Sequence, residues 1–218
     1  MNVRKILDSY RMAIRDTKVP YFVEDLDAII YLNEAENEAA RRASLLVDST
    51  SPEVIYSVFA GDSVVQISSK IISIRRMILT SSSVPLKKRL AREMDEFAPG
   101  WSNSTNTSTP TSAVMDYESN SVFLYPKPDA DNELRMTVVR EPLIYMTNDA
   151  NVPEIPARYH FSLIEWMKYR TFSEEDSDMF DQKLAEIALA RFEKEFGEGR
   201  GAINERFEFE HYDDVGEF

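Results

Sequence analysis

Apolar residues recur at helical spacing in the first fifth of the chain. Residues 2–15 place one apolar stripe on a helix, formed by Val3, Ile6, Leu7, Tyr10 and Ile14. Residues 24–46 repeat the pattern with Ile29, Leu32, Ala39, Ala40, Ala43 and Leu46. This second segment begins with acids and ends with Arg41 and Arg42, which suits the helix dipole at both ends. We therefore expect two N-terminal helices.

The last third of the chain returns to helical spacing after Pro153 and Pro156. Residues 157–172 carry Phe161, Ile164, Trp166 and Met167, and residues 178–196 carry Phe180, Leu184, Ile187, Ala188, Phe192 and Phe196. Asp176 or Ser177 is the expected N-cap of the last helix, and Gly197 is its expected end. Together the two ends of the chain predict an antiparallel bundle of about four main helices, from residues 1–50 and 153–197.

The middle of the chain is richer in Val, Ile and Tyr and is broken by turn residues. We expect an α+β protein in which residues 53–145 form a β-rich lobe inserted between the helices. The segments expected in this lobe are two short strands around residues 60–62, a strand at 71–79, a short helix at about 87–97, a polar loop at 102–112, and a hairpin pair with turns at 118–120 and 129–132.

Residues 198–218 predict an extended C-terminal arm. The stretch "ERFEFEHY" alternates strictly, with Phe207, Phe209 and His211 on one side and Glu208, Glu210 and Tyr212 on the other. We predict that Phe207, Phe209 and Tyr212 bind another subunit or ring. Seven acids against two bases give this segment a charge of -5, so a frayed acidic tail is the alternative interpretation.

The composition excludes several classes of protein. The 38 acidic residues outnumber the 25 basic residues, and a net charge of -13 opposes sequence-specific binding to a phosphate backbone. Without cysteine, the chain has neither disulfides nor thiolate chemistry, and a structural zinc site is not expected. No apolar run approaches the roughly 18–20 residues that span a bilayer, so we expect no membrane anchor and no signal peptide.

Motifs of catalysis are missing from the sequence, which contains no GxGxxG, GxxxxGK, GxSxG or HExxH pattern. His160 has Glu165 five residues downstream, off its helical face, and no nucleophile accompanies it. Glu34 and Glu38 share a helix face, but a solvated surface explains such a pair. The acids of residues 174–181 lack the spacing of a calcium loop, and helix capping explains them better. We therefore expect no enzyme activity, no cofactor and no metal, and a His160 that helps to position a helix.

Four segments occur in a characteristic order: "YLNEAENEAARRASLL", "PLKKRLAREMDEFAPGW", "VFLYPKPDADNELRMTVVREP", and "VPEIPARYHFSLIEWMKYRTF" followed by "FEKEFG". Their order and spacing resemble the head-to-tail adaptor (connector) proteins of short-tailed bacteriophages, over about residues 1–197. The chain departs from that family at residues 21–23, where the family often has a tryptophan before the second helix. The segment beyond Gly197 has no family pattern that it matches residue by residue.

This resemblance implies a structural virion protein of the phage neck, present in the host cytoplasm during assembly. The family forms rings, typically of twelve subunits, between the portal protein and the tail nozzle protein. DNA passes through the channel without sequence-specific binding, and the resemblance implies no membrane partner. Acidity would then keep DNA from adhering to the channel wall, or would only maintain the solubility of the monomer. The alternative function is another phage neck or tail component, such as a tail-completion or nozzle protein.

Overall fold

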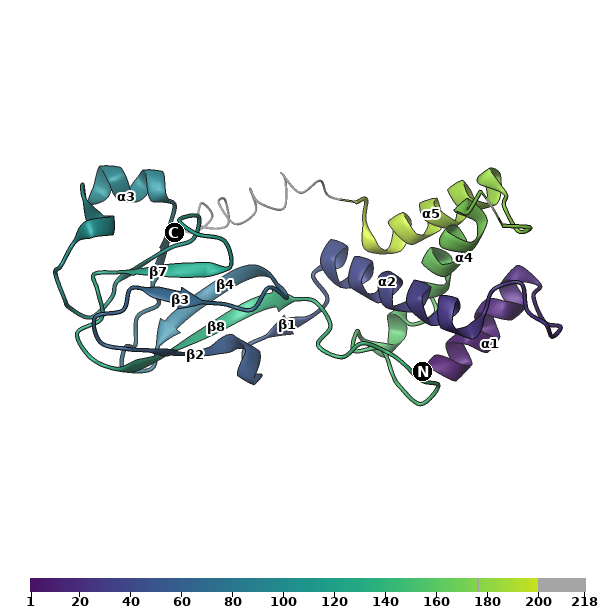
Figure 1. Ribbon diagram of the computed structural model, residues 1–218, viewed down its shortest axis with the longest axis horizontal. Helices are drawn as coiled ribbons and strands as arrows, with labels where there is room; N and C mark the ends of the chain where they lie inside the picture. The colour runs from purple at the N-terminus through teal and green to yellow at the C-terminus, as the bar shows by residue number, and fades with distance from the viewer. Residues whose placement is uncertain (176, 200–218) are drawn as a thin grey trace. The chain divides into compact units, whose positions relative to one another are not determined.

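The computed structural model describes residues 1–175 and 177–199 (Figure 1). The predicted α+β class is confirmed, because the described residues contain five α-helices and two β-sheets. The helices are α1 (Val3–Ile14), α2 (Asp25–Ala43), α3 (Ala91–Phe97), α4 (Leu163–Ser173) and α5 (Gln182–Phe196). The strands are β1 (Val47–Asp48), β2 (Ile55–Val58), β3 (Val64–Gln66), β4 (Ile71–Leu79), β5 (Lys87–Arg89), β6 (Ser112–Val114), β7 (Ser121–Tyr125) and β8 (Asn132–Arg140). Short 3-10 helices lie at Pro52–Val54, Trp101–Asn103 and Ala157–Tyr159.

The described chain divides into two compact units. Residues 1–46 and 141–199 form what we call the helical unit, and Val47–Arg140 form the sheet unit. Each unit has a hydrophobic core of its own.

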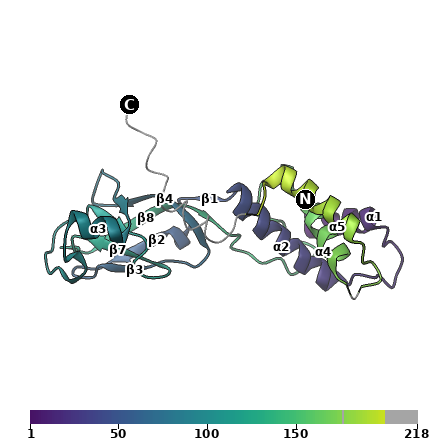
Figure 2. The same ribbon diagram turned by 90° about the horizontal axis from the view of Figure 1, so that it is seen from above.

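Helices α1, α2, α4 and α5 enclose the core of the helical unit. Helix α4 contacts α5 and α2, and α1 contacts both α4 and α2. The two views show α4 and α5 side by side (Figure 1, Figure 2). The predicted stripe of α1 is confirmed, because all five of its apolar side chains are buried. The largest fully buried side chains of this core are Tyr10, Phe192, Ile6, Leu32, Met146 and Leu163.

Polar caps and one glycine determine where the long helices begin and end. The side chain of Asn2 accepts a hydrogen bond from the Lys5 amide (3.3 Å), and Asp181 accepts one from the Leu184 amide (3.0 Å). Such caps satisfy amide groups that have no partner within the helix. Helix α5 ends at Gly197, whose φ of 89° is a conformation that other residues rarely adopt, and this predicted end is confirmed.

The sheet unit contains two four-stranded sheets that share one core. In the first sheet, β8 pairs with β4 along one edge and with β1 and β2 along the other, all antiparallel. The second sheet has the order β3-β7-β6-β5, in which only β5 and β6 run parallel. The core residues come from both sheets and include Val58, Val65, Met77, Leu79, Leu124, Leu134 and Met136. A smaller cluster packs Met94 of α3 on Trp101, Val114 and Phe123.

The prediction of a short helix at 87–97 places the beginning of this helix too early in the chain. Lys87–Arg89 form strand β5, which pairs with Ser112–Val114, and α3 begins only at Ala91. The Glu93 side chain accepts a hydrogen bond from the Leu90 amide (3.1 Å), which fixes the helix start at this point. Pairing with a strand distant in sequence therefore overrode the local helical pattern.

One of the two hairpins predicted for the middle of the chain is wrong. Strands β6 and β7 pair as expected, but β7 and β8 belong to different sheets. Residues 126–131 connect them and include Pro126 and Pro128, which have no amide hydrogen to donate to a strand ladder. The turn signal marked the end of a strand and not a hairpin.

The starts of the last two helices also differ from the prediction. Residues 157–159 form a 3-10 helix, and α4 begins at Leu163. Helix α5 begins at Gln182 with Asp181 as its cap, so Ser177 is not the N-cap, and Asp176 lies outside the described residues. Ala188, Phe192 and Phe196 are buried as predicted, but Phe161, Phe180, Leu184 and Ile187 are exposed.

Candidate interaction site

His160 is buried and has partners on both sides of its ring. Its Nε2 lies 2.9 Å from the Ile155 carbonyl oxygen, and its Nδ1 lies 2.8 Å from the backbone nitrogen of Met1. Because a carbonyl oxygen only accepts, Nε2 is the donor and Nδ1 is the acceptor. Only 1% of the residue is exposed. His160 therefore joins α1 to the segment before α4, as the predicted positioning role requires.

The two carboxylates of α2 that were candidates for a pair, Glu34 and Glu38, bind different arginines. Glu34 accepts a hydrogen bond from Arg170 of α4. Glu38 accepts hydrogen bonds from Arg41 (2.8 Å) and Arg42 (2.8 Å). Glu174 accepts one from the Tyr31 hydroxyl (2.5 Å). Glu34 and Glu174 thus connect α2 with α4, whereas Glu38 bonds to arginines of its own helix, and this geometry gives all three acids a structural role.

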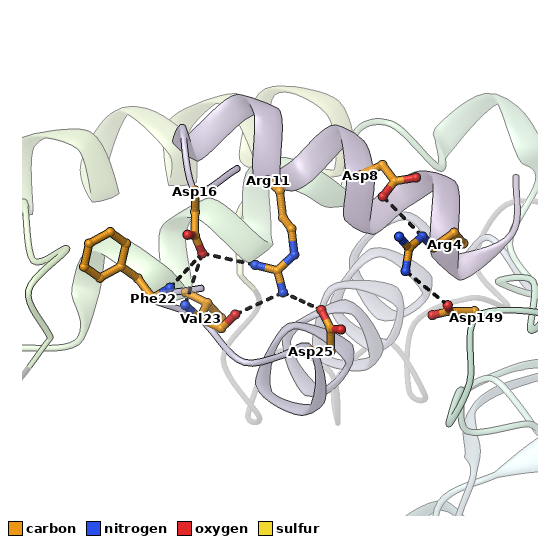
Figure 3. A network of polar contacts seen from close by, with 8 residues as sticks. All are labelled: Arg4, Asp8, Arg11, Asp16, Phe22, Val23, Asp25 and Asp149. Atoms are coloured by element: carbon orange, nitrogen blue, oxygen red, sulfur yellow. Dashed lines mark hydrogen bonds and ion pairs between the residues drawn. The ribbon is translucent and has the colours of Figure 1, made fainter. Parts of the chain in front are cut away.

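A buried ion pair immobilises the loop between α1 and α2. The Arg11 guanidinium donates to Asp16 Oδ2 (3.1 Å) and to the Val23 carbonyl oxygen (3.0 Å), and it also contacts Asp25 at the start of α2. The same Asp16 oxygen accepts hydrogen bonds from the amides of Phe22 (3.1 Å) and Val23 (3.2 Å), as Figure 3 shows. Arg11 and Asp16 are both buried. Removal of one member of such a pair typically costs about 3–5 kcal/mol.

The immobilised loop presents apolar side chains to solvent. Val19 and Phe22 of the loop and Leu26 in the first turn of α2, which together we call the loop face, are each at least 68% exposed. In Figure 3 the Phe22 ring points away from the ion pair that holds its own amide. The Arg11 guanidinium also lies over the Tyr21 ring, 3.5 Å from its centroid. The loop is thus ordered from within while its apolar side chains remain uncovered.

Helix α5 carries a second exposed apolar surface. Phe180, which precedes the helix, and Leu184 and Ile187, which lie on it, together form what we call the α5 face and are 40–45% exposed, whereas Ala185, Ala188 and Phe192 of α5 are buried. Contiguous exposed apolar residues often mark protein–protein contacts. The loop face and the α5 face are both in the helical unit, which makes this unit the candidate contact region.

A buried carboxylate secures the segment that leads into α4. Glu36 Oε1 accepts hydrogen bonds from the amides of Glu154 and Ile155, the second at 3.1 Å. Burial raises the pKa of Glu36 to about 7, although the two amide donors act in the opposite direction. Asn33, one turn earlier on α2, donates to the Met146 carbonyl oxygen (2.9 Å) and accepts from the Met146 amide (2.8 Å). Helix α2 therefore holds this connecting segment at two points.

The sequence model of the SU10 adaptor protein family matches residues 1–209. The chain belongs to the SU10 adaptor protein family. This is a family of phage head-to-tail adaptors, so the resemblance predicted from the four segments is confirmed. No curated protein matches the chain. The adaptor is a structural protein of the phage neck.

The arm residues predicted to bind a partner, Phe207, Phe209 and Tyr212, lie outside the described part of the adaptor. Within residues 1–175 and 177–199, no three acidic or histidine side chains gather in a way that would bind a metal ion. No helix in those ranges has both the length and the apolar character required to cross a bilayer.

Sequence reasoning missed the Arg11 network and the two exposed faces of the adaptor. One signal was available for Arg11, which follows Leu7 by four residues and precedes Ile14 by three, so it lies on the buried side of α1. A charge on a buried stripe requires a partner. The exposure of Phe22 and Leu184 has no comparable local signal, because it depends on which helices pack against which surface.

Proposed function

We propose that the adaptor forms a closed ring of twelve subunits between the portal and the tail nozzle of its phage, and that this ring lines the DNA channel. The family match supports a neck position, and the apolar surface of the helical unit supports assembly. In this proposal the subunits fold in the host cytoplasm and join the particle as a non-enzymatic structural protein without a cofactor.

The observation that carries the ring proposal is the loop face on an immobilised loop. Fully burying a phenylalanine or leucine side chain stabilises a contact by about 1.5–3 kcal/mol. A loop that is already ordered loses little conformational entropy on docking. The Arg11–Asp16 pair thus prepares Phe22 for a partner surface. Lateral contact between subunits is the role that we assign to the loop face and the α5 face.

The two units take separate roles in this proposal. The helices of residues 1–50 and 153–197 act as an antiparallel bundle that supplies the lateral contacts, and the β-rich lobe of 53–145 is an inserted domain. The arm of 198–218 reaches the portal ring through Phe207, Phe209 and Tyr212. The alternation of residues 205–212 in the sequence supports an extended arm.

The net negative charge of the adaptor supports the proposal that DNA does not adhere to the channel wall. Each subunit carries a net charge of -13, and negative charge that faces the channel repels the phosphate backbone. We therefore expect an assembled ring that retains no duplex DNA at low salt. Measured retention under those conditions would contradict this part of the proposal.

Native mass spectrometry of the purified adaptor, alone and mixed with the portal ring of its phage, tests the ring proposal. We expect a closed multimer on the portal. An adaptor that ignores the portal and binds a tail protein would favour a nozzle or tail-completion role.

Deletion of residues 202–218 tests the arm, and we expect lost portal binding with an unchanged circular dichroism spectrum. Unchanged portal binding would remove the arm from the proposal.

A further inference from the structure

The sheet unit carries a basic groove between two edge strands. Strand β4 is at one edge of the first sheet and β5 at one edge of the second. Between them lies an open groove of about 420 Å³, lined by Arg75, Arg76 and residues 85–89. Five cationic side chains contribute to the lining: Arg75, Arg76, Lys87, Lys88 and Arg89.

This clustering is unusual for so acidic a chain. Residues 47–140 contain 11 acidic and 10 basic residues, and half of the bases line the groove. Lysine and arginine on edge strands do protect sheets from pairing with one another. That role does not require a concave site or cations from both sheets.

Ion pairs among the described residues do not account for three of the five cations of the groove. Arg75, Arg76 and Lys87 are exposed, and none of them has a carboxylate within 4 Å among the residues that the structure describes. Arg89 instead donates to the Ser112 hydroxyl (3.3 Å), and its guanidinium lies over the Phe97 ring at 4.1 Å. The groove thus presents ordered positive charge to an acidic occupant.

The shape of the groove favours a peptide over duplex DNA. Its volume is that of a site for a few side chains, whereas a duplex presents a long row of phosphates on a wide rod. Edge strands also offer backbone groups along which an extended peptide can lie. An acidic segment in extended conformation fits both features.

The sequence of the adaptor contains a segment with the alternation expected of an extended peptide and with more acids than bases. If residues 205–212, "ERFEFEHY", are extended, their alternation places Glu208 and Glu210 on one side, together with Arg206 and Tyr212, and Phe207 and Phe209 on the other, together with Glu205 and His211. Glu208 and Glu210 match the groove in charge, and Phe207 and Phe209 on the opposite side stay free for the portal contact proposed above. Every subunit of a ring has one groove and one such segment, so the contact repeats from subunit to subunit until the ring closes.

We propose that the basic groove of β4 and β5 binds the acidic side of residues 205–212 from the neighbouring adaptor subunit. This inference rests on the proposed ring. The contact links adjacent subunits by charge, at a site in the sheet unit and separate from the apolar faces of the helical unit.

Carbodiimide cross-linking of the full-length protein tests the contact, because this reagent joins a lysine amine to a carboxylate that it touches. Chains labelled with ¹⁴N and ¹⁵N are mixed, assembled on the portal ring, cross-linked and digested. We expect Lys87 or Lys88 joined to Glu208 or Glu210, with the two peptides carrying different labels. Joined peptides that always share one label would overturn the contact between subunits.

Two charge-reversed variants sharpen the test. Arg75→Glu with Arg76→Glu alters the groove, and Glu208→Arg with Glu210→Arg alters the arm. We expect each variant alone to lose about tenfold or more of the inter-label cross-links. A mixture of the two should regain them, because the arm of the first variant meets the groove of the second. No recovery in the mixture would contradict the proposal.

The remaining outcomes separate this inference from the ring itself. A ring on the portal without inter-label cross-links overturns the groove contact and leaves the ring proposal standing. A chain that forms no ring overturns both. Binding of duplex DNA by the unmodified adaptor, abolished by Arg75→Glu with Arg76→Glu, would assign the groove to phosphate and overturn the peptide proposal.

Discussion

The helical unit and the sheet unit place charge in opposite ways. In the helical unit, arginine and acid lie inside and hold loops, while Val19, Phe22 and Leu184 face solvent. The sheet unit has an apolar core and one buried pair, Asp48 with Arg140, while its cations line an open groove. The comparison teaches that one chain can offer two kinds of contact, apolar from one unit and electrostatic from the other.

The two kinds of contact respond differently to salt. Attraction between exposed charges falls as the Debye length shortens, from about 10 Å at 0.1 M salt to about 3 Å at 1 M. Apolar contacts do not weaken in this way. Substitutions in the two units should therefore differ in their effects on stability and on assembly.

Asp16→Ala should have the largest effect. It removes the buried carboxylate partner of Arg11, so that only the exposed Asp25 still pairs with this guanidinium, and it removes the acceptor of the Phe22 and Val23 amides. We expect the helical unit to lose about 3–5 kcal/mol of stability, read from amide hydrogen exchange in α1 and α2. Asp8→Ala is the control, because Asp8 pairs with Arg4 on the exposed side of the same helix (Figure 3) and should have no measurable effect. Equal effects of the two variants would show that the buried pair has no special role.

Asp48→Asn should have the next largest effect, and in the other unit. Burial opposes ionisation of Asp48, but the amides of Thr50 and Ser51 (each 3.0 Å) and the Arg140 guanidinium (2.6 Å) together hold the pKa of this carboxyl well below its usual range. The variant should destabilise the sheet unit by about 2–3 kcal/mol, measured by hydrogen exchange in β8.

The sign of the pH effect follows from the lowered pKa of Asp48. The stability that this carboxylate contributes is present above its unfolded pKa and is lost only as the pH falls through the lower folded pKa. The difference between Asp48→Asn and the unmodified protein should therefore stay constant from pH 8 to pH 5. A difference that shrinks in this range would contradict the assigned pairing.

Glu36→Gln should change the stability of the protein less than the two preceding substitutions. At high pH it should raise this stability, whereas they lower it. The folded pKa of Glu36 is raised from 4.5 to about 7, so its contribution to stability is fully present below the unfolded pKa and is lost as the pH rises through about 7. The glutamine carbonyl can accept the same two amides without charge. At pH 8 we expect the variant to be more stable by on the order of 2 kcal/mol, and at pH 4 we expect no difference. Urea unfolding at both pH values measures this, and a loss of stability at pH 8 would refute it.

Leu184→Ser should change the stability of the free subunit least, by about 0.5 kcal/mol or less, because the side chain is 43% exposed. Assembly on the portal should nevertheless be lost if the α5 face makes a lateral contact. Lys183→Ser, on the exposed side of the same helix, is the matched control and should assemble normally. Native mass spectrometry measures the assembly of both variants. If both assemble normally, the α5 face makes no contact between subunits.

Much of the helical unit could be predicted from the sequence, because helical periodicity is a local property. The stripe of α1 and the end of α5 at Gly197 follow from residues close together in the chain. The exposure of Leu184 could not be predicted in this way, since the packing of α4 and α2 decides which side of α5 is covered.

The sheet unit was less predictable, because the pairing of strands is not a local property of the sequence. Positions of strands such as β4 follow from alternation, but strand partners depend on contacts between distant segments. Thus β7 pairs with β3 and β6 and not with β8, and Lys87–Arg89 pair with β6 instead of extending a helix. The family could be recognised because it depends on the order and spacing of segments. The basic groove could not, because its cations come from two sheets.

A cryo-electron microscopy map of the neck of the phage particle would test the central proposal most directly. We predict a closed ring of twelve copies of this chain between the portal and the tail nozzle, with the helical units in lateral contact and density for residues 205–212 at the basic groove of the adjacent subunit. A map that places the chain elsewhere in the tail, or as single copies without lateral contact, would contradict the account.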